Sequence, residues 1–303
     1  MTVIKIDKIN TLSHAIYYYD KISTTIEDEC SLDFSSTTFI RNNYLSIIGL
    51  AIMQRNLYGK SINIITPDFH KNRKVYNAMS NIGFLKEFIN IEKSLDFHKT
   101  MIKYTHIPLN SQEKIEDFYL HFIERCQQHI SNLSPELLNK IIQKVLELFS
   151  NVFRHSQNDL GLFCSGQFYP EGKKFNFTIV DGGITIPKNV NTFLLKKYKK
   201  ELSLTNKIFR DKFKPLNAVD AITWAMKEKH STSGEGGLGL SLLEQLIIKS
   251  SGKLEIISGK GYYAITNGEY TSKLLEESFP GTIISIELST NENKYYYLNE
   301  ESK

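Results

Sequence analysis

The chain has 303 residues, of which 41% are hydrophobic and 23% are charged, and its formal net charge is +4. This composition is typical of a globular protein, and no run reaches the roughly 18 apolar residues of a membrane span, so we expect no membrane segment. The three cysteines lack metal or disulfide spacing, and the N-terminus alternates polar and apolar residues like a strand rather than a signal peptide. These features predict a cytoplasmic protein, long enough for two domains.

Residues 1–94 alternate strand and helix patterns, as in a small α/β layer domain. Strands are expected at residues 3–9, 30–34, 61–66 and 87–91, and helices at residues 12–27, 39–57 and 69–82. Asp68 and Gly83 are expected to cap the last of these helices at its two ends.

Residues 95–111 have weak periodicity and include Pro108, and we expect them to connect two domains. A helix pattern follows at residues 113–130. Ser134 and Pro135 then predict the start of another helix, because serine is a good N-cap and proline suits the first turn. Apolar residues recur at helical spacing after this start, so one face of the helix should be buried.

This helix carries Glu147, Asn151 and His155 four residues apart, and therefore on one stripe. A carboxylate can orient or deprotonate a nucleophile, an amide oxygen suits Mg²⁺, and an imidazole can donate to a phosphate. A solvated helix face is the alternative interpretation.

Strand patterns at residues 160–168 and 174–180 predict a hairpin, and its second strand runs into Asp181, Gly182 and Gly183. Such a run after a strand is most often a turn. In a functional interpretation, the glycines let a flat ring approach the backbone and the carboxylate accepts a hydrogen bond from an exocyclic amine.

A glycine-rich run at residues 231–240 leads directly into a predicted helix. Free N–H groups and the dipole of a helix start favour phosphate, although glycine loops before helices are common. Strand patterns at residues 253–257 and 262–265 then predict a hairpin that turns at residues 258–261. Pro280, Gly281 and Thr282 open a last strand.

Residues 188–229 are rich in lysine, most densely at residues 196–200. We interpret this run as a solvated face, and the alternative is an anionic partner, either nucleic acid or the phosphates of a nucleotide. Nucleic acid is not expected, because the aromatic residues of a recognised nucleic-acid-binding fold are not interleaved with the basic ones. A segment of this length is a candidate lid, and the alternative is a surface excursion.

Taken in order, ELFSNVFRHS, DGGITIP, GEGGLGLSLL and PGTIISIEL resemble the motif series of the gyrase, histidine-kinase and mismatch-repair ATPase superfamily (GHKL). They resemble its N-box, its adenine box, its lid glycines and its closing strand, over roughly residues 110–290. AVDAITWAMKEKHST is similar to the subset of these ATPases found with STAS domains. The resemblance implies a Bergerat-type two-layer α/β sandwich with a mixed sheet at residues 112–303, binding ATP and Mg²⁺.

The resemblance also implies roles for single residues. Glu147 would be the catalytic carboxylate and Asn151 the Mg²⁺ ligand, with His155 near a phosphate. Asp181 would accept a hydrogen bond from the adenine amine, and Gly183 would make room for the base. The other nucleotide-binding residues that the motifs imply are Ile186, Gly234, Gly236, Gly237, Leu238, Gly239, Leu240 and Thr282, the last of them beneath Asp181.

Two positions depart from the family pattern. Thr185 stands where the adenine box has a second spaced glycine, so the loop must differ or the pocket must be tighter. The lid reads Gly234-Glu235-Gly236-Gly237 instead of a plain alternation, which leaves open which early glycine contacts phosphate.

In the first ninety or so residues, LDFSSTTFIRNNYLSIIGLAI, GKSINIITP and NAMSNIGFLKEF resemble a STAS domain, the module of anti-sigma-factor antagonists. Where that family carries a phosphoacceptor serine, residues 39–43 read Phe-Ile-Arg-Asn-Asn, and Ser35 and Ser36 are interpreted as turn residues. We therefore expect residues 1–94 to form a docking or interaction domain.

Two functions remain open. One is ATP hydrolysis or phosphoryl transfer to a protein, like that of an anti-sigma-type serine kinase, with a STAS-like or sigma-regulator-like partner. The other is an ATP-gated binding switch in signalling, with little turnover, whose lid at residues 193–237 orders on ATP. A homodimer is compatible with both. A histidine kinase is not expected because its dimerisation motif is missing, and intact Glu147, Asn151 and Asp181 argue against a scaffold without nucleotide.

Overall fold

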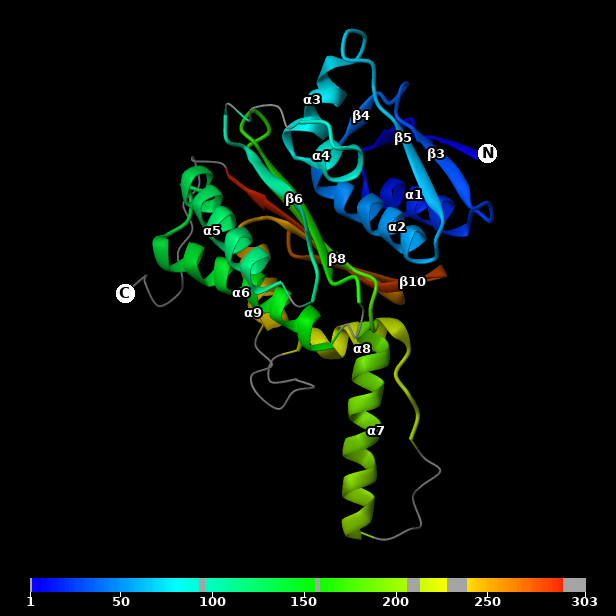
Figure 1. Ribbon diagram of the computed structural model, residues 1–303. Coiled ribbons are helices and arrows are strands. Elements are labelled where there is room, and N and C mark those ends of the chain that lie inside the picture. The colour runs from blue at the N-terminus through cyan, green and yellow to red at the C-terminus, as the bar shows by residue number, and fades with distance from the viewer. Residues whose placement is uncertain are drawn as a thin grey trace. The chain divides into compact units, whose positions relative to one another are not determined.

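The computed structural model contains two compact units, each built from helices and strands (Figure 1). It describes residues 2–92, 96, 98–109, 111–155, 159–205, 213–227 and 239–290, without the side chains of residues 148, 150–155, 201–205, 239–242 and 246. The first unit comprises residues 1–131 and 159–180, and the second comprises residues 132–158 and 181–303. The predicted α/β class is confirmed. None of the helices within these described ranges is long and apolar enough to cross a membrane.

The helices of the first unit are α1 (Leu12–Thr24), α2 (Leu45–Leu57), α3 (Arg73–Asn81), α4 (Phe84–Ile89) and α5 (Gln112–His129), with one 3₁₀ turn, η1 (Asn42–Tyr44). Its strands are β1 (Thr2–Lys5), β2 (Lys8–Ile9), β3 (Glu29–Asp33), β4 (Phe39–Ile40), β5 (Ser61–Ile65), β6 (Met101–Ile107), β7 (Leu162–Tyr169) and β8 (Lys174–Asp181), whose last residue belongs to the second unit. The second unit contains α6 (Pro135–His155), α7 (Ile186–Thr205), α8 (Ala218–Met226), α9 (Gly239–Lys249), β9 (Lys253–Thr266) and β10 (Glu269–Ser289). Hydrogen bonds order the strands of the first unit as β1-β3-β5, β2-β4 and β6-β7-β8, and they pair β9 with β10 in the second unit.

Strands β1, β3 and β5 form a parallel sheet, and α2 packs against β5 on one side and against β6 and β7 on another. Every residue of α2 from Leu45 to Ile52 is buried. A helix that is apolar around its whole circumference is expected where it is enclosed by neighbouring elements. The apolar run at residues 45–52 therefore joins the layers of the first unit.

Three predicted features of the first unit differ from the structure. The helix expected at residues 39–57 begins at Leu45, because Phe39 and Ile40 pair in parallel with Lys8 and Ile9. The helix expected at residues 69–82 begins at Arg73, since the carboxylate of Asp68 instead accepts the N–H of His70, 2.8 Å away, in a preceding turn. Where a strand was expected, at residues 87–91, the chain forms the end of α4, whose Phe84 and Leu85 are buried.

The segment expected to connect two domains, residues 95–111, contains strand β6. Its residues pair antiparallel with β7, for example Ile107 with Leu162. Long-range pairing of this kind leaves no local signal beyond a short apolar run, so the sequence pattern did not predict this strand.

Alternation along β8 places Phe175 and Phe177 on one face and Asn176 and Thr178 on the other. The phenylalanine face meets α5, where the ring centroids of Phe122 and Phe177 lie 5.0 Å apart. Large apolar rings packed this way supply much of the burial that holds α5 on the sheet.

The opposite face meets η1 through a seam of buried polar groups. The Nδ2 of Asn43 donates to Thr178 Oγ1 at 2.9 Å, and the Nδ2 of Asn42 donates to Gln167 Oε1 at 2.9 Å. Ser165 Oγ donates to the carbonyl of Asn43, also at 2.9 Å. Because buried polar groups are costly when unpaired, these bonds fix one register between η1 and the strands.

In the second unit, β9 and β10 form a long antiparallel hairpin around Asn267 and Gly268, whose φ angles are 52° and 87°. Asn-Gly is the sequence best suited to a two-residue hairpin turn. The turn predicted at residues 258–261 is wrong, because β9 continues through it. Gly261 serves packing: a Cβ there would lie 2.8 Å from the carbonyl oxygen of Ala218 in α8.

The predicted start of α6 is confirmed, since Ser134 Oγ accepts the N–H of Leu137 at 3.2 Å. The buried side chains of α6 include Ile141, Val145 and Phe149, and α6 packs against α9.

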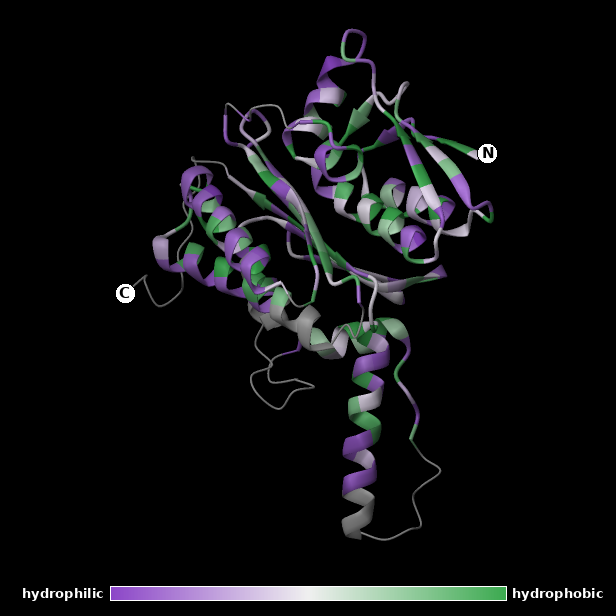
Figure 2. Ribbon diagram, viewed as in Figure 1, coloured by the Kyte–Doolittle hydropathy of each residue, from purple (hydrophilic) through white to green (hydrophobic). Residues whose placement is uncertain are grey.

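Figure 2 shows hydrophobic and hydrophilic residues alternating along α7, which packs against α8.

The lysine-rich run lies on α7, and the lysines at residues 196, 197, 199 and 200 are exposed. The chain returns beside this helix: Asn191 Nδ2 donates to the carbonyl of Leu216 at 2.9 Å, and the N–H of Leu216 donates to Asn191 Oδ1 at 2.8 Å. The exposure agrees with a solvated face. The lid expected at residues 193–237 stays a prediction, and residues 206–212 and 228–237 of it lie outside the described residues.

Candidate functional site

Asp181 is the last residue of β8 and is almost completely buried, at 4% exposure. Its carboxyl Oδ1 accepts the N–H of Gly183 at 2.8 Å, which closes a tight turn over the strand end. Burial raises the pKa of Asp181 to about 7, against the lowering effect of the Gly183 hydrogen bond. A carboxyl group has about four acceptor positions, so one bond from Gly183 leaves capacity to bind a further donor.

Strand β10 passes the end of β8 at Gly281, whose φ is 127°. A Cβ on Gly281 would lie 2.1 Å from the carbonyl oxygen of Asp181 and 2.8 Å from the Cα of Gly182. Only glycine permits both this backbone angle and this approach. The backbone that carries the Asp181 carboxyl group is therefore held from behind by β10.

Replacing Gly281 by alanine should destabilise the protein by roughly 1–3 kcal/mol, because the added methyl group has no room and the backbone angle becomes strained. The Gly59→Ala variant is the matched control: Gly59 also has a positive φ, of 71°, but nothing lies within 4 Å of its added Cβ. Urea unfolding of the two variants separates steric overlap from backbone strain. Equal losses would contradict a close contact between β10 and the end of β8.

A buried hydroxyl pair lies beside this contact. Ser258 on β9 and Thr282 on β10 face each other in register, and their hydroxyl oxygens are 2.8 Å apart. Ser258 Oγ donates to the carbonyl of Gly281 at 3.0 Å and accepts the N–H of Ile186 at 2.8 Å. Since Ser258 has a single hydroxyl hydrogen, Thr282 is the donor in the pair. Ser258 thus ties the first residue of α7 to both strands of the hairpin.

Thr185 has a local role in this structure. Its hydroxyl oxygen accepts the N–H of Lys188 at 3.3 Å, and its carbonyl accepts the N–H of Asn189 at 3.0 Å. These are the bonds of a residue that caps a helix start, here that of α7. The threonine therefore fixes where the loop after Asp181 turns into helix.

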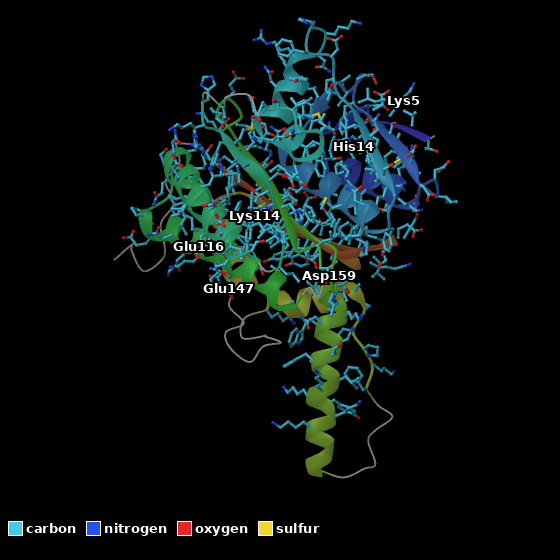
Figure 3. All side chains as sticks on the ribbon, in the orientation of Figure 1. Lys5, His14, Lys114, Glu116, Glu147 and Asp159 are labelled. Atoms are coloured by element: carbon cyan, nitrogen blue, oxygen red, sulfur yellow. The ribbon has the colours of Figure 1, made fainter. Side chains whose placement is uncertain are left out.

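Glu147 lies on α6 (Figure 3), and its carboxylate Oε2 is 2.6 Å from the Nζ of Lys144, one turn earlier. The side chain of Glu147 is 35% exposed and that of Lys144 is 17% exposed. Pairs three residues apart on a helix are neighbours, so the sequence contained the signal for this ion pair. The pair holds the carboxylate in one orientation, while about a third of the side chain remains open to a ligand.

The structure brings four of the predicted site residues together. Asp181, Gly183, Ile186 and Thr282 are connected through the bonds and contacts around Ser258 and Gly281. Ser258 was not predicted as a site residue, because the sequence placed it in a turn. In the structure it is buried on β9, opposite Thr282.

The remaining predicted residues are described in part or not at all. Asn151 and His155 lie on α6, with side chains outside the described set. Gly239 and Leu240 begin α9, which confirms that a helix follows the glycine-rich run. Gly234, Gly236, Gly237 and Leu238 lie outside the described residues.

In the part of the chain that the structure covers, no three His, Cys, Asp or Glu side chains gather as metal ligands would. The Mg²⁺ site expected at Asn151 therefore stays a prediction, since that side chain is not among those described.

No model of a known protein family matches the chain, and a search of the curated proteins finds no match either.

Proposed function

We propose that the second unit binds Mg²⁺-ATP at the end of β8, as an ATPase or protein kinase of the Bergerat type. The observation that carries the proposal is the buried carboxyl group of Asp181, which follows a strand, leads into two glycines and keeps acceptor capacity. A buried carboxyl group is costly, because burial disfavours its charged form. A role in binding accounts for this cost.

Adenine fits the chemistry of this carboxyl group. Its exocyclic amine is a donor, and an ionised carboxylate accepts hydrogen bonds and donates none. Guanine places a carbonyl oxygen where adenine has the amine, and two acceptors facing each other repel. Gly182 and Gly183 leave the backbone free of side chains where a flat ring would lie.

The phosphates have a candidate position at the N-terminus of α9, which begins at Gly239 after the glycine-rich run. Backbone N–H groups and the dipole at a helix start favour anions. Helix α6 packs against α9, so Glu147 and Asn151 belong to the neighbouring helix. An amide oxygen at Asn151 would be a suitable Mg²⁺ ligand.

Glu147 is the proposed catalytic group. Phosphoryl transfer requires a positioned nucleophile, and a carboxylate within reach can orient or deprotonate it. Lys144 Nζ, 2.6 Å from Glu147 Oε2, holds this carboxylate in one orientation. The nucleophile is water in an ATPase, or a hydroxyl group of a protein partner in a serine kinase.

The pH dependence of adenosine binding tests the role of Asp181. Its pKa is about 7, so roughly a tenth of the carboxyl groups are ionised at pH 6 and nine tenths at pH 8. If the ionised carboxylate accepts from the adenine amine, affinity should rise about ten-fold from pH 6 to pH 8. Adenosine has no group that titrates in this range, so the change reports on the protein. Calorimetric titrations at both pH values measure it, and equal affinities would contradict the assignment.

A further inference from the structure

The first unit contains a cavity of about 610 Å³, within the range of small-molecule sites. Its lining residues include Phe39 and Arg41, Gln167 and Tyr169, and Lys174 and Asn176. Phe39 and Arg41 lie in residues 39–43, the segment that was compared above with the phosphoacceptor position of STAS domains and that contains no serine.

Phe39 and Arg41 reach the cavity from one extended segment, in which alternate residues point to one side. Arg41 has extended backbone angles, with φ −83° and ψ 119°. Ile40 between the two is buried, whereas Phe39 is 47% exposed. The segment thus sends an apolar side chain into the core and presents an aromatic ring and a guanidinium to the cavity.

The walls are fixed by hydrogen bonds. The N–H of Arg41 donates to the carbonyl of Ile9 at 2.7 Å, which anchors the Arg41 backbone. Asn42 Nδ2 donates to Gln167 Oε1 at 2.9 Å and to Met101 Sδ at 3.3 Å. A site held in this way loses little freedom when a ligand binds.

The lining is cationic and aromatic. Arg41 and Lys174 carry positive charge and Glu171 carries negative charge, and His98 adds ring nitrogens. Phe39 and Tyr169 are aromatic residues of the same lining. A guanidinium recognises carboxylate and phosphate through paired hydrogen bonds, and aromatic side chains favour stacking with flat rings.

We propose that this cavity binds a small aromatic anion, a flat ring that carries one phosphate or carboxylate group. Arg41 and Lys174 hold the anionic group, and Phe39 packs against the ring. This site goes beyond the nucleotide site proposed for the second unit and does not depend on it.

The test uses 1-naphthyl phosphate, 1-naphthoate and neutral 1-naphthol as probes, titrated into the full chain by calorimetry. The two anions should bind at one site per chain, and 1-naphthol at least about ten-fold more weakly, since charge-assisted bonds are lost. The Arg41→Met and Lys174→Met variants should each weaken anion binding by about ten-fold or more. The Lys5→Met variant should bind as the parent chain does, because Lys5 is an exposed residue of β1 (Figure 3) outside the lining.

Saturating Mg²⁺-ATP and the Asp181→Asn variant should leave probe binding unchanged, which separates this site from the nucleotide site. Lys174 is exposed, so its variant tests the proposal even if Arg41→Met fails to fold. Displacement of the probe by ATP, equal affinity in Lys174→Met and the parent chain, or equal binding of 1-naphthol would each overturn the proposal. The tighter of the two anions identifies phosphate or carboxylate as the natural group.

Discussion

Replacing Asp181 by asparagine should weaken ATP binding by roughly 10- to 100-fold. A hydrogen bond to a charged group contributes about 1.5–3 kcal/mol, and 1.4 kcal/mol corresponds to ten-fold in affinity. The asparagine also presents a donor that can face the adenine amine, which adds repulsion. Calorimetric titration of Mg²⁺-ATP into both proteins measures the loss. The Asp220→Asn variant is the matched control, because Asp220 is an exposed carboxylate near the start of α8.

The stability of the same variant shows whether it is folded and whether Asp181 titrates as described. Folding raises the pKa of Asp181 from 3.8 to about 7, so the folded state binds more protons than the unfolded state between these values. The contribution of Asp181 to the stability of the parent chain is therefore lost as pH rises from about 4 to about 7. The asparagine variant lacks this pH-dependent contribution. Unfolding by urea at pH 5 and pH 8 gives the comparison. Unchanged ATP affinity in a folded variant would rule out the adenine assignment.

Replacing Glu147 by glutamine should lower ATP turnover by roughly 100- to 10,000-fold, the range that general acid–base groups contribute. ATP affinity should stay within about three-fold, because the carboxylate acts on the nucleophile and not on the nucleotide. Phosphate release under saturating Mg²⁺-ATP measures turnover, and calorimetry measures affinity.

Two controls separate catalysis from the ion pair. In the Lys144→Met variant the ion pair is lost but the carboxylate remains, so turnover should fall far less than in Glu147→Gln. Glu136→Gln changes an exposed carboxylate in the first turn of the same helix and should have little effect. If Glu147→Gln and Lys144→Met lost turnover equally, Glu147 would be a structural residue.

Elements with local signals could be predicted from the sequence, and elements defined by distant partners could not. Ser134 and Pro135 marked the start of α6 because a cap acts within one turn of the chain. Residues 39–40 read as part of a helix, and only pairing with β2 makes them a strand. Likewise β6 exists because β7 lies beside it, and a periodicity argument contains no information about that neighbour.

The candidate site divides in the same way. Asp181 and Gly183 were predicted from a single motif, and the structure connects them by one short turn. Ser258 could not be placed, because its position opposite Thr282 depends on the register of a long hairpin. The glycines at residues 259 and 261 read as turn residues, whereas Gly261 is small so that α8 can pack closely on β9.

The most direct test of ATP binding is calorimetric titration of ATP into the full chain, with and without Mg²⁺ and with GTP as the control nucleotide, followed by phosphate release on the same sample. We predict saturable ATP binding at one site, tighter with Mg²⁺ and weaker for GTP. Steady phosphate release would identify an ATPase, and binding without release would favour a switch or a kinase that requires its partner. No ATP binding at millimolar concentration would contradict the proposed nucleotide site.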